Sequence, residues 1–97
     1  MSKLEKELEN NIKKWCDQNN VLFIKFTPMG EKGWPDRIVI LPSGKHLWVE
    51  LKREGKVLSR LQGHRIRRLR RQNTDAVFFD NSVACINYLK RFIQDGV

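Results

Sequence analysis

Two short apolar runs joined by three turn residues constrain the fold more than any other feature of this chain. Residues 36–41 and 45–52 are rich in Ile, Val and Leu, and Pro42, Ser43 and Gly44 lie between them. Apolar runs around a short turn, with Gly available for a left-handed position, are typical of a β-hairpin. We therefore expect a sheet that contains at least one antiparallel pair of strands.

The rest of the chain alternates between helical and extended patterns. Apolar spacing predicts helices at residues 2–20, 58–72 and 82–94, and strands at residues 21–26, 36–41, 45–52 and 76–79. The segment 27–35 contains two Pro and two Gly and is expected to be a loop. The predicted order αβββαβα indicates an α/β fold with a small mixed sheet flanked by helices.

Length and charge narrow the class of protein. The 97 residues are enough for one domain with one modest core, so we assign residues 1–97 to a single domain. Nineteen Lys and Arg against 11 Asp and Glu give a net charge of +8. Such an excess favours a polyanionic partner, either nucleic acid or an anionic membrane surface. A membrane is the poorer choice because no predicted helix combines a basic face with a broad aromatic one.

The apolar runs are too short to span a bilayer, and the charged first residues lack the apolar core of a signal peptide. A cytoplasmic location is therefore expected. Cys16 and Cys85 are too few for a disulfide framework and are predicted to be buried thiols. Neither has a His or a second Cys at the spacing of a zinc site.

Polar side chains interrupt the hairpin at one end. In a strand, residues two apart share a face, so Trp48, Glu50 and Lys52 point the same way. With Pro42-Ser43-Gly44 as the loop, Asp36 lies opposite Glu50, where two carboxylates repel each other. A divalent cation or the Lys52 ammonium could relieve that repulsion. Alternatively, Glu50 and Lys52 form a solvated pair and Asp36 simply begins a strand.

The same residues resemble a known family. The string GWPD, residues 33–36, followed by ELK, residues 50–52, resembles the PD-(D/E)xK nuclease signature. The longer string from Lys25 to Gln62, including LSRLQ at residues 58–62, is similar to the virus-type replication-repair nuclease domain, VRR-NUC. The resemblance implies a restriction-endonuclease-like fold and metal-dependent cleavage of phosphodiester bonds in branched or flapped DNA.

The resemblance also implies roles for particular residues. Asp36 and Glu50, together with the carbonyl of Leu51, would bind Mg²⁺ or Mn²⁺. Lys52 would orient or deprotonate the attacking water. The chemistry needs this set because a metal polarises the scissile phosphate and an ammonium stabilises developing negative charge.

The family pattern leaves two catalytic positions open. An acidic residue is expected on the first helix, and both Glu5 and Glu9 flank its apolar stripe. Gln62 matches a family glutamine near the active site. It also completes a capping box with Ser59, a purely structural role. Lys25 matches a family lysine, or is simply an exposed lysine of a strand.

Cationic residues gather between residues 52 and 71, where Glu54 is the only acid. Six arginines in one predicted helix would repel one another, and bound phosphates would offset that repulsion. The residues that we expect to contact DNA are Lys25, Lys32, Arg53, Lys56, Arg65, Arg67, Arg68 and Arg71. Trp34, beside them, could stack on an unpaired base or close the core.

These observations predict a Mg²⁺- or Mn²⁺-dependent endonuclease, an enzyme that hydrolyses branched DNA as a junction resolvase or a flap nuclease does. The alternative is a basic DNA-binding module that keeps the fold without catalysis. The resemblance favours a homodimer in a bacterial or phage-infected cell. Val83 and Tyr88 lie off the inward stripe of the last helix, so they are the predicted dimer contacts.

Overall fold

The computed structural model describes the backbone of residues 3–95 and the side chains of residues 4–93. Its elements are α1 (Lys3–Gln18), β1 (Leu22–Lys25), β2 (Arg37–Ile40), β3 (His46–Leu51), α2 (Arg60–Arg71), β4 (Asp75–Phe79) and α3 (Ser82–Asp95). The predicted order αβββαβα is confirmed; β1, β2 and β3 are each two residues shorter than expected, and β4 is one residue longer. Residue 2 of the predicted first helix lies outside the described residues.

The four strands form one mixed sheet in the order β1-β2-β3-β4. β1, β2 and β3 are antiparallel neighbours, whereas β4 runs parallel to β3. The hairpin between β2 and β3 turns where the sequence predicts, and Gly44 has a φ of +93°. Its register pairs Arg37 with Val49, so one further step along each strand brings Asp36 opposite Glu50.

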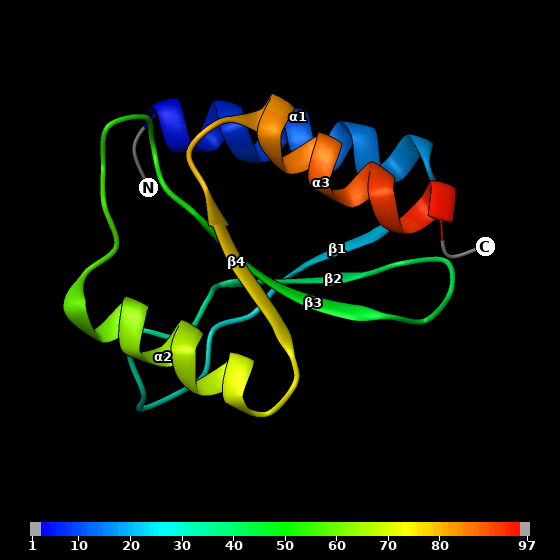
Figure 1. Cartoon of the computed structure of the whole chain (residues 1–97). Helices are drawn as coiled ribbons and strands as arrows, with labels where there is room; N and C mark the ends of the chain where they lie inside the picture. The colour runs from blue at the N-terminus through cyan, green and yellow to red at the C-terminus, as the bar shows by residue number, and fades with distance from the viewer. Residues whose placement is uncertain (1–2, 96–97) are drawn as a thin grey trace.

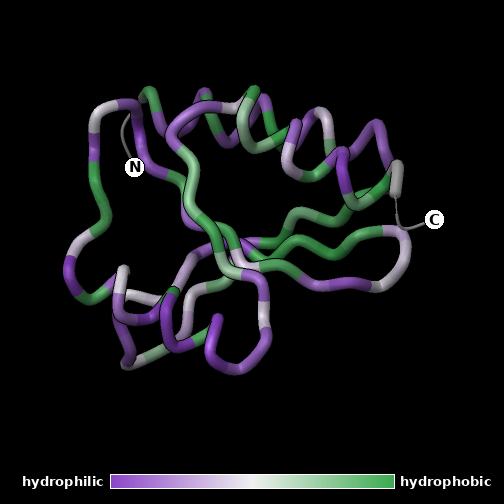
Figure 2. The backbone as a smooth tube through the Cα atoms, viewed as in Figure 1, coloured by the Kyte–Doolittle hydropathy of each residue, from purple (hydrophilic) through white to green (hydrophobic). Residues whose placement is uncertain are grey.

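Two helices cover one face of this sheet. Figure 1 shows α1 and α3 side by side on that face, and the strands beneath them are hydrophobic in Figure 2. The core consists of apolar side chains from both helices and from the inward positions of β2 and β3, among them Ile12, Val39, Leu47, Val49 and Leu89. The alternation of buried and half-buried residues along β2 follows the period of a strand.

α2 packs against β4, on the side of the sheet away from the other two helices (Figure 1). The helix begins after Ser59, whose hydroxyl accepts a hydrogen bond from Gln62 N at 3.1 Å. In return, Gln62 Oε1 accepts one from Ser59 N at 2.8 Å. The predicted capping box is therefore present, and it fixes where the helix starts.

The structure corrects one prediction about α3. Tyr88, expected to lie off the inward stripe, contacts the rings of Phe79 and Phe92 at centroid distances of 5.5 and 5.2 Å. A tyrosine can bury its ring and leave its hydroxyl near solvent, so an inward position is compatible with its polarity. Val83, the other predicted contact, is 66% exposed.

Both cysteines are buried free thiols, as the sequence predicts. Burial raises the pKa of Cys16 to about 11 and that of Cys85 to about 12, so neither thiol is reactive. Within the described part of the chain, no helix is both long and apolar enough to cross a bilayer.

Candidate active site

The sheet brings Asp36 and Glu50 together at one end of the hairpin. Asp36 directly precedes β2, and Glu50 is the penultimate residue of β3. Strand alternation directs both side chains away from α1 and α3, because their neighbours Arg37, Val49 and Leu51 face the core. Glu50 is only 6% exposed. The carboxylate pair expected from the sequence is therefore formed.

The environment of this pair disfavours its charge. Burial, followed by the negative charge of Asp36, raises the pKa of Glu50 to about 7, and Lys52 opposes the shift only in part. Burial also raises the pKa of Asp36, against the opposing effect of the Arg37 guanidinium. Carboxylates with raised pKa values are common in catalytic and metal sites, because such sites hold charged groups away from water.

Arg37 connects the first helix to the pair. Its side chain is 1% exposed, and Nη1 lies 3.0 Å from Asp36 Oδ2 while Nη2 lies 2.7 Å from Glu9 Oε1. The contact with Glu9 is an ion pair whose angle falls outside hydrogen-bond geometry. Nη1 also donates to the Asp36 carbonyl oxygen at 3.0 Å. Glu9 of the first helix is thus joined to Asp36 through the buried Arg37 guanidinium.

The sequence analysis did not single out Arg37. The signal was present, because Arg37, Val39 and Leu41 alternate along β2 and the last two are core residues. A charged residue at an inward position of a strand needs a buried partner. Glu5, the other candidate acid, is half-buried on α1.

The donor set of this pair is suited to a hard divalent cation. Asp36 Oδ1 is buried and accepts no hydrogen bond, which leaves one carboxylate oxygen available as a ligand. Glu50 and the Leu51 carbonyl would supply further oxygen ligands of the kind that Mg²⁺ and Mn²⁺ prefer. Among the described residues, however, no cluster of three or more His, Cys, Asp and Glu forms. A cation here would keep positions open for water and phosphate.

Two lysines lie near the carboxylates. Lys52 follows β3 directly, is half-buried, and its positive charge lowers the pKa of Glu50. Lys25 ends β1 opposite Arg37, and its charge lowers the pKa of Asp36. Both lysines therefore have their positive charges near the carboxylate pair.

The loop before Asp36 fits tightly against the first turn of α2. Gly33 has a φ of +88°, and a Cβ at this position would lie 2.5 Å from Leu61 Cγ. Only glycine accommodates both the positive φ and the close approach. Gln62, next to Leu61, uses its amide oxygen in the capping box, so the structure supports its structural role. A catalytic role for Gln62 remains a prediction.

Arg65 holds the same loop from α2. Its guanidinium stacks over Trp34 at 4.4 Å from the ring centroid, and its Nε donates to the Lys32 carbonyl oxygen at 3.1 Å. Glu31 accepts a 3.3 Å hydrogen bond from Trp34 Nε1 and lies 3.8 Å from Arg65 Nη2. Arg65, expected to contact DNA, and Trp34, expected either to stack on an unpaired base or to close the core, thus contact each other and hold this loop.

The other predicted DNA contacts are spread over the surface. Lys32, Lys56, Arg67 and Arg71 are exposed, and Arg68 is exposed with its Nη1 donating to Gln72 at 2.9 Å. α2 therefore presents an exposed row of arginines, which we call the arginine row: Arg67, Arg68 and Arg71.

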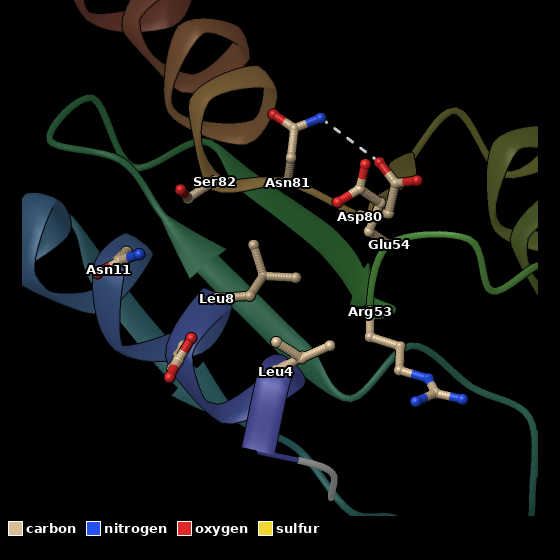
Figure 3. A pocket seen from close by; sticks show the side chains of 9 residues that line it. Leu4, Leu8, Asn11, Arg53, Glu54, Asp80, Asn81 and Ser82 are labelled. Atoms are coloured by element: carbon tan, nitrogen blue, oxygen red, sulfur yellow. Dashed lines mark hydrogen bonds between the residues drawn. The ribbon is translucent and has the colours of Figure 1, made fainter.

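Arg53 lies apart from this row, at a pocket of ≈ 210 Å³ between α1 and the turn before α3. Figure 3 shows Leu4 and Leu8 of α1 lining this pocket, with Asp80 and Asn81 across from them. The Arg53 side chain points away from Asp80 and Asn81 (Figure 3). The pocket contains three acids, Glu7, Glu54 and Asp80, so an anionic ligand does not suit it.

The raised pKa of Glu50 predicts how stability depends on pH. Between the ordinary value of 4.5 and about 7, the folded protein holds a proton that the unfolded chain has released. Stability is therefore expected to fall as pH rises through this window and to level off above it. Glu50→Gln should remove most of this slope and raise the Tm at pH 8. Thermal melts in EDTA between pH 4.5 and 8 measure both effects.

Glu54→Gln is the matched control, because Glu54 is exposed. It should melt like the parent at each pH. A Glu50→Gln variant with the parental slope would show that Glu50 is solvated in the folded protein.

Comparison with solved structures identifies the fold. One structure, described as a VRR_NUC domain, superposes with a TM-score of 0.80 at 22% identity over 99% of this chain and 100% of its own. A second, described as a VRR_NUC domain protein, has a TM-score of 0.75 at 19% identity and covers 97% of this chain and 91% of its own. No protein-family model matches the sequence, and the search of curated proteins gave no match. The chain therefore has the fold of the VRR_NUC domain, a nuclease fold, as its motifs predicted.

Proposed function

We propose that this protein is a Mg²⁺- or Mn²⁺-dependent endonuclease that hydrolyses phosphodiester bonds in branched DNA in the cytoplasm. The observation that carries the proposal is the pair of half-buried Asp36 and buried Glu50 with Lys52 near it, in a chain that has the fold of VRR_NUC domains. Incubation with either metal and with duplex, flap, fork and four-way junction DNA tests the proposal.

The proposed chemistry divides among few residues. Asp36, Glu50 and the Leu51 carbonyl would hold the cation, which when bound polarises the scissile phosphate and lowers the pKa of a water. Lys52 would orient the attacking water and stabilise negative charge on the phosphoryl oxygens. Arg37 keeps the Asp36 carboxylate in place, since it binds Oδ2 and leaves Oδ1 without a partner. Glu50 must lose its proton before it can bind a cation.

The exposed cations would bind the DNA backbone. The arginine row carries three charges on one helix, and the charge of Lys25 acts on Asp36. Phosphate contacts of this kind are independent of sequence and weaken with salt, because binding releases counterions from DNA. We propose that the arginine row positions the duplex while the carboxylate pair faces the cleaved strand.

Replacing Arg67, Arg68 and Arg71 together by Ala is expected to weaken binding to duplex and branched DNA alike. If all three contact duplex phosphates, the slope of log K against log salt should decrease in magnitude by up to about 2.7, at about 0.9 per contact. Fluorescence anisotropy at several salt concentrations measures the slope.

The matched control replaces Lys13, Lys14 and Lys90 by Ala, since these exposed lysines lie on the helices of the opposite face. It removes the same charge and should change the slope far less. Equal slopes for both triple variants would show that only net charge matters and that α2 does not face DNA.

A non-catalytic DNA-binding module is the second candidate. It would keep the arginine row and the net charge of +8. It has no need, however, of a carboxylate pair with one member buried, which repels DNA phosphates. Burial raises the pKa of Glu50, so we expect its ionised form to cost stability at neutral pH. A costly acidic site within a basic protein favours catalysis.

We propose that the active form is a homodimer, because two symmetric cuts in a branched DNA need two active sites. Val83 and Tyr88 were the dimer contacts expected on α3, but Tyr88 packs against Phe79 and Phe92 of its own chain. β1 offers another surface. Leu22 and Ile24 are 57% and 44% exposed on the sheet face away from α1 and α3, and α2 reaches that face at β4. Within the described residues, α1 is the only helix that contacts β1.

Sedimentation equilibrium at micromolar protein, with and without junction DNA, tests the assembly. Ile24→Asp is expected to yield a monomer, because a charge in an apolar interface lacks a partner. Val83→Asp, a matched change at an exposed residue of α3, should remain a dimer. A parent protein that is monomeric under both conditions would contradict the dimer and favour a nuclease that acts alone.

A further inference from the structure

An apolar pocket of ≈ 270 Å³ lies beside the carboxylate pair and takes no part in holding a metal. It is lined by Phe26, Pro28, Glu31, Trp34, Trp48 and Leu69. These residues come from the end of β1, the loop after it, β3 and α2. The pocket is therefore bounded in part by α2 and by the loop before Asp36.

The pocket is rich in aromatic rings that are only half-buried. The rings of Phe26 and Trp48 meet edge to face, with centroids 5.1 Å apart and planes at 87°. Trp34 is fixed by Arg65 on its ring and by the hydrogen bond from its Nε1 to Glu31. A core would close over such rings, because burying them is favourable. Here they are instead held in place around an open space.

The pocket is one step from the carboxylates. Phe26 N donates to the Asp36 carbonyl oxygen at 2.8 Å, so the two residues are direct neighbours across the sheet. Trp48 precedes Glu50 by two residues on β3 and faces the same side, a separation of about 6.7 Å along a strand. A group bound in the pocket would thus lie about one nucleotide from a phosphate at the carboxylates.

The charges at the pocket suit a nucleic acid. Arg65 stands over Trp34. The only acid of the lining, Glu31, lies close to the Arg65 guanidinium and accepts the Trp34 hydrogen bond, so its charge is offset. An aromatic-lined space with a cation at its edge is typical of sites where single-stranded bases stack.

We propose that this pocket binds an unpaired nucleobase, the one next to the phosphate at the carboxylate pair. The proposal deepens the proposed nuclease function and rests on it. A base within a duplex is paired and stacked and cannot enter, whereas a base of a flap or a branch point can. The pocket would therefore make the protein prefer DNA with unpaired nucleotides beside the cleaved bond.

Binding measured in EDTA separates this preference from cleavage. Trp48→Leu removes the stacking ring and keeps an apolar side chain. It should weaken binding to a flapped duplex by about 5- to 150-fold, the loss expected for one stacked base. Binding to the fully paired duplex of the same sequence should not change. Fluorescence anisotropy with both DNAs gives the two affinities.

Trp15→Leu is the matched control, because Trp15 is a half-buried tryptophan on α1, on the opposite face of the sheet. It should lower stability as Trp48→Leu does and leave both affinities unchanged. Equal affinity of the Trp48→Leu variant and the parent for flapped DNA would overturn the proposal. So would an equal loss on both DNAs, which would mark Trp48 as part of the duplex surface.

Photocrosslinking of the parent protein avoids the risk that Trp48→Leu fails to fold. A flap that carries 5-iododeoxyuridine at its first unpaired nucleotide should crosslink to Phe26, Trp34 or Trp48, as identified by mass spectrometry. Crosslinks found only outside the pocket would contradict the proposal. If the flap crosslinks in the pocket but the protein cleaves no DNA, the base-binding proposal is supported and the proposed nuclease activity is wrong.

Discussion

Asp36→Asn is expected to reduce metal-dependent cleavage by about 10²-fold or more, the scale of losing one preorganised electrostatic group at a reacting phosphate. Asparagine keeps the size of the side chain but gives a cation one weaker, neutral ligand. DNA binding should remain or improve, because a negative charge near the phosphates is removed. Glu50→Gln should behave in the same way. Cleavage rates and anisotropy on one branched DNA measure both properties.

Asp75→Asn is the matched control for this loss. Asp75 forms an exposed ion pair with Lys45 at 2.8 Å and lies at the start of β4, outside the carboxylate pair. Exposed pairs contribute little to stability, so this variant should fold and cleave like the parent. Parental cleavage by Asp36→Asn would show that the carboxylate pair is not the metal site.

Arg37→Met is expected to destabilise the protein by about 3 to 5 kcal/mol, because it leaves Glu9 and Asp36 without their buried counter-charge. A loss of this size is a large part of the stability of a small domain, typically about 5 to 15 kcal/mol. Methionine fills much of the same volume, so the effect should come from charge. Urea unfolding with and without Mg²⁺ measures it, and Mg²⁺ should restore part of the loss.

Arg67→Met provides the comparison, since Arg67 is exposed on α2 and should change stability little. A double variant that adds Glu9→Gln to Arg37→Met measures the coupling between the two side chains. If Arg37→Met unfolds at the parental urea concentration, the guanidinium is solvated and does not position Asp36.

Much of the fold follows from local patterns in the sequence. The turn at Pro42-Ser43-Gly44 sets the register of β2 and β3, and that register alone brings Asp36 opposite Glu50. The capping box at Ser59 likewise fixes the start of α2. Both depend on residues at most a few positions apart, which is why the sequence predicts them.

Contacts between distant segments were not predictable in this way. The ion pair of Glu9 and Arg37 joins α1 to β2, and Arg65 reaches back 33 residues to the Lys32 carbonyl. The sequence could not show that Glu9 pairs with Arg37, since Glu5 and Glu9 flank the same stripe of the helix. Tyr88 was misplaced for the same reason, because its partner Phe79 belongs to another element.

Cleavage of end-labelled flap, fork and four-way junction DNA by the purified protein, with Mn²⁺ or Mg²⁺ and with EDTA, tests the central claim most directly. The account predicts metal-dependent cuts near the branch point, little cleavage of the matched duplex, and none by Asp36→Asn prepared in parallel. Tight binding of branched DNA by the folded parent with no cleavage in either metal would contradict it. Equal cleavage by the parent and Asp36→Asn would contradict it as well.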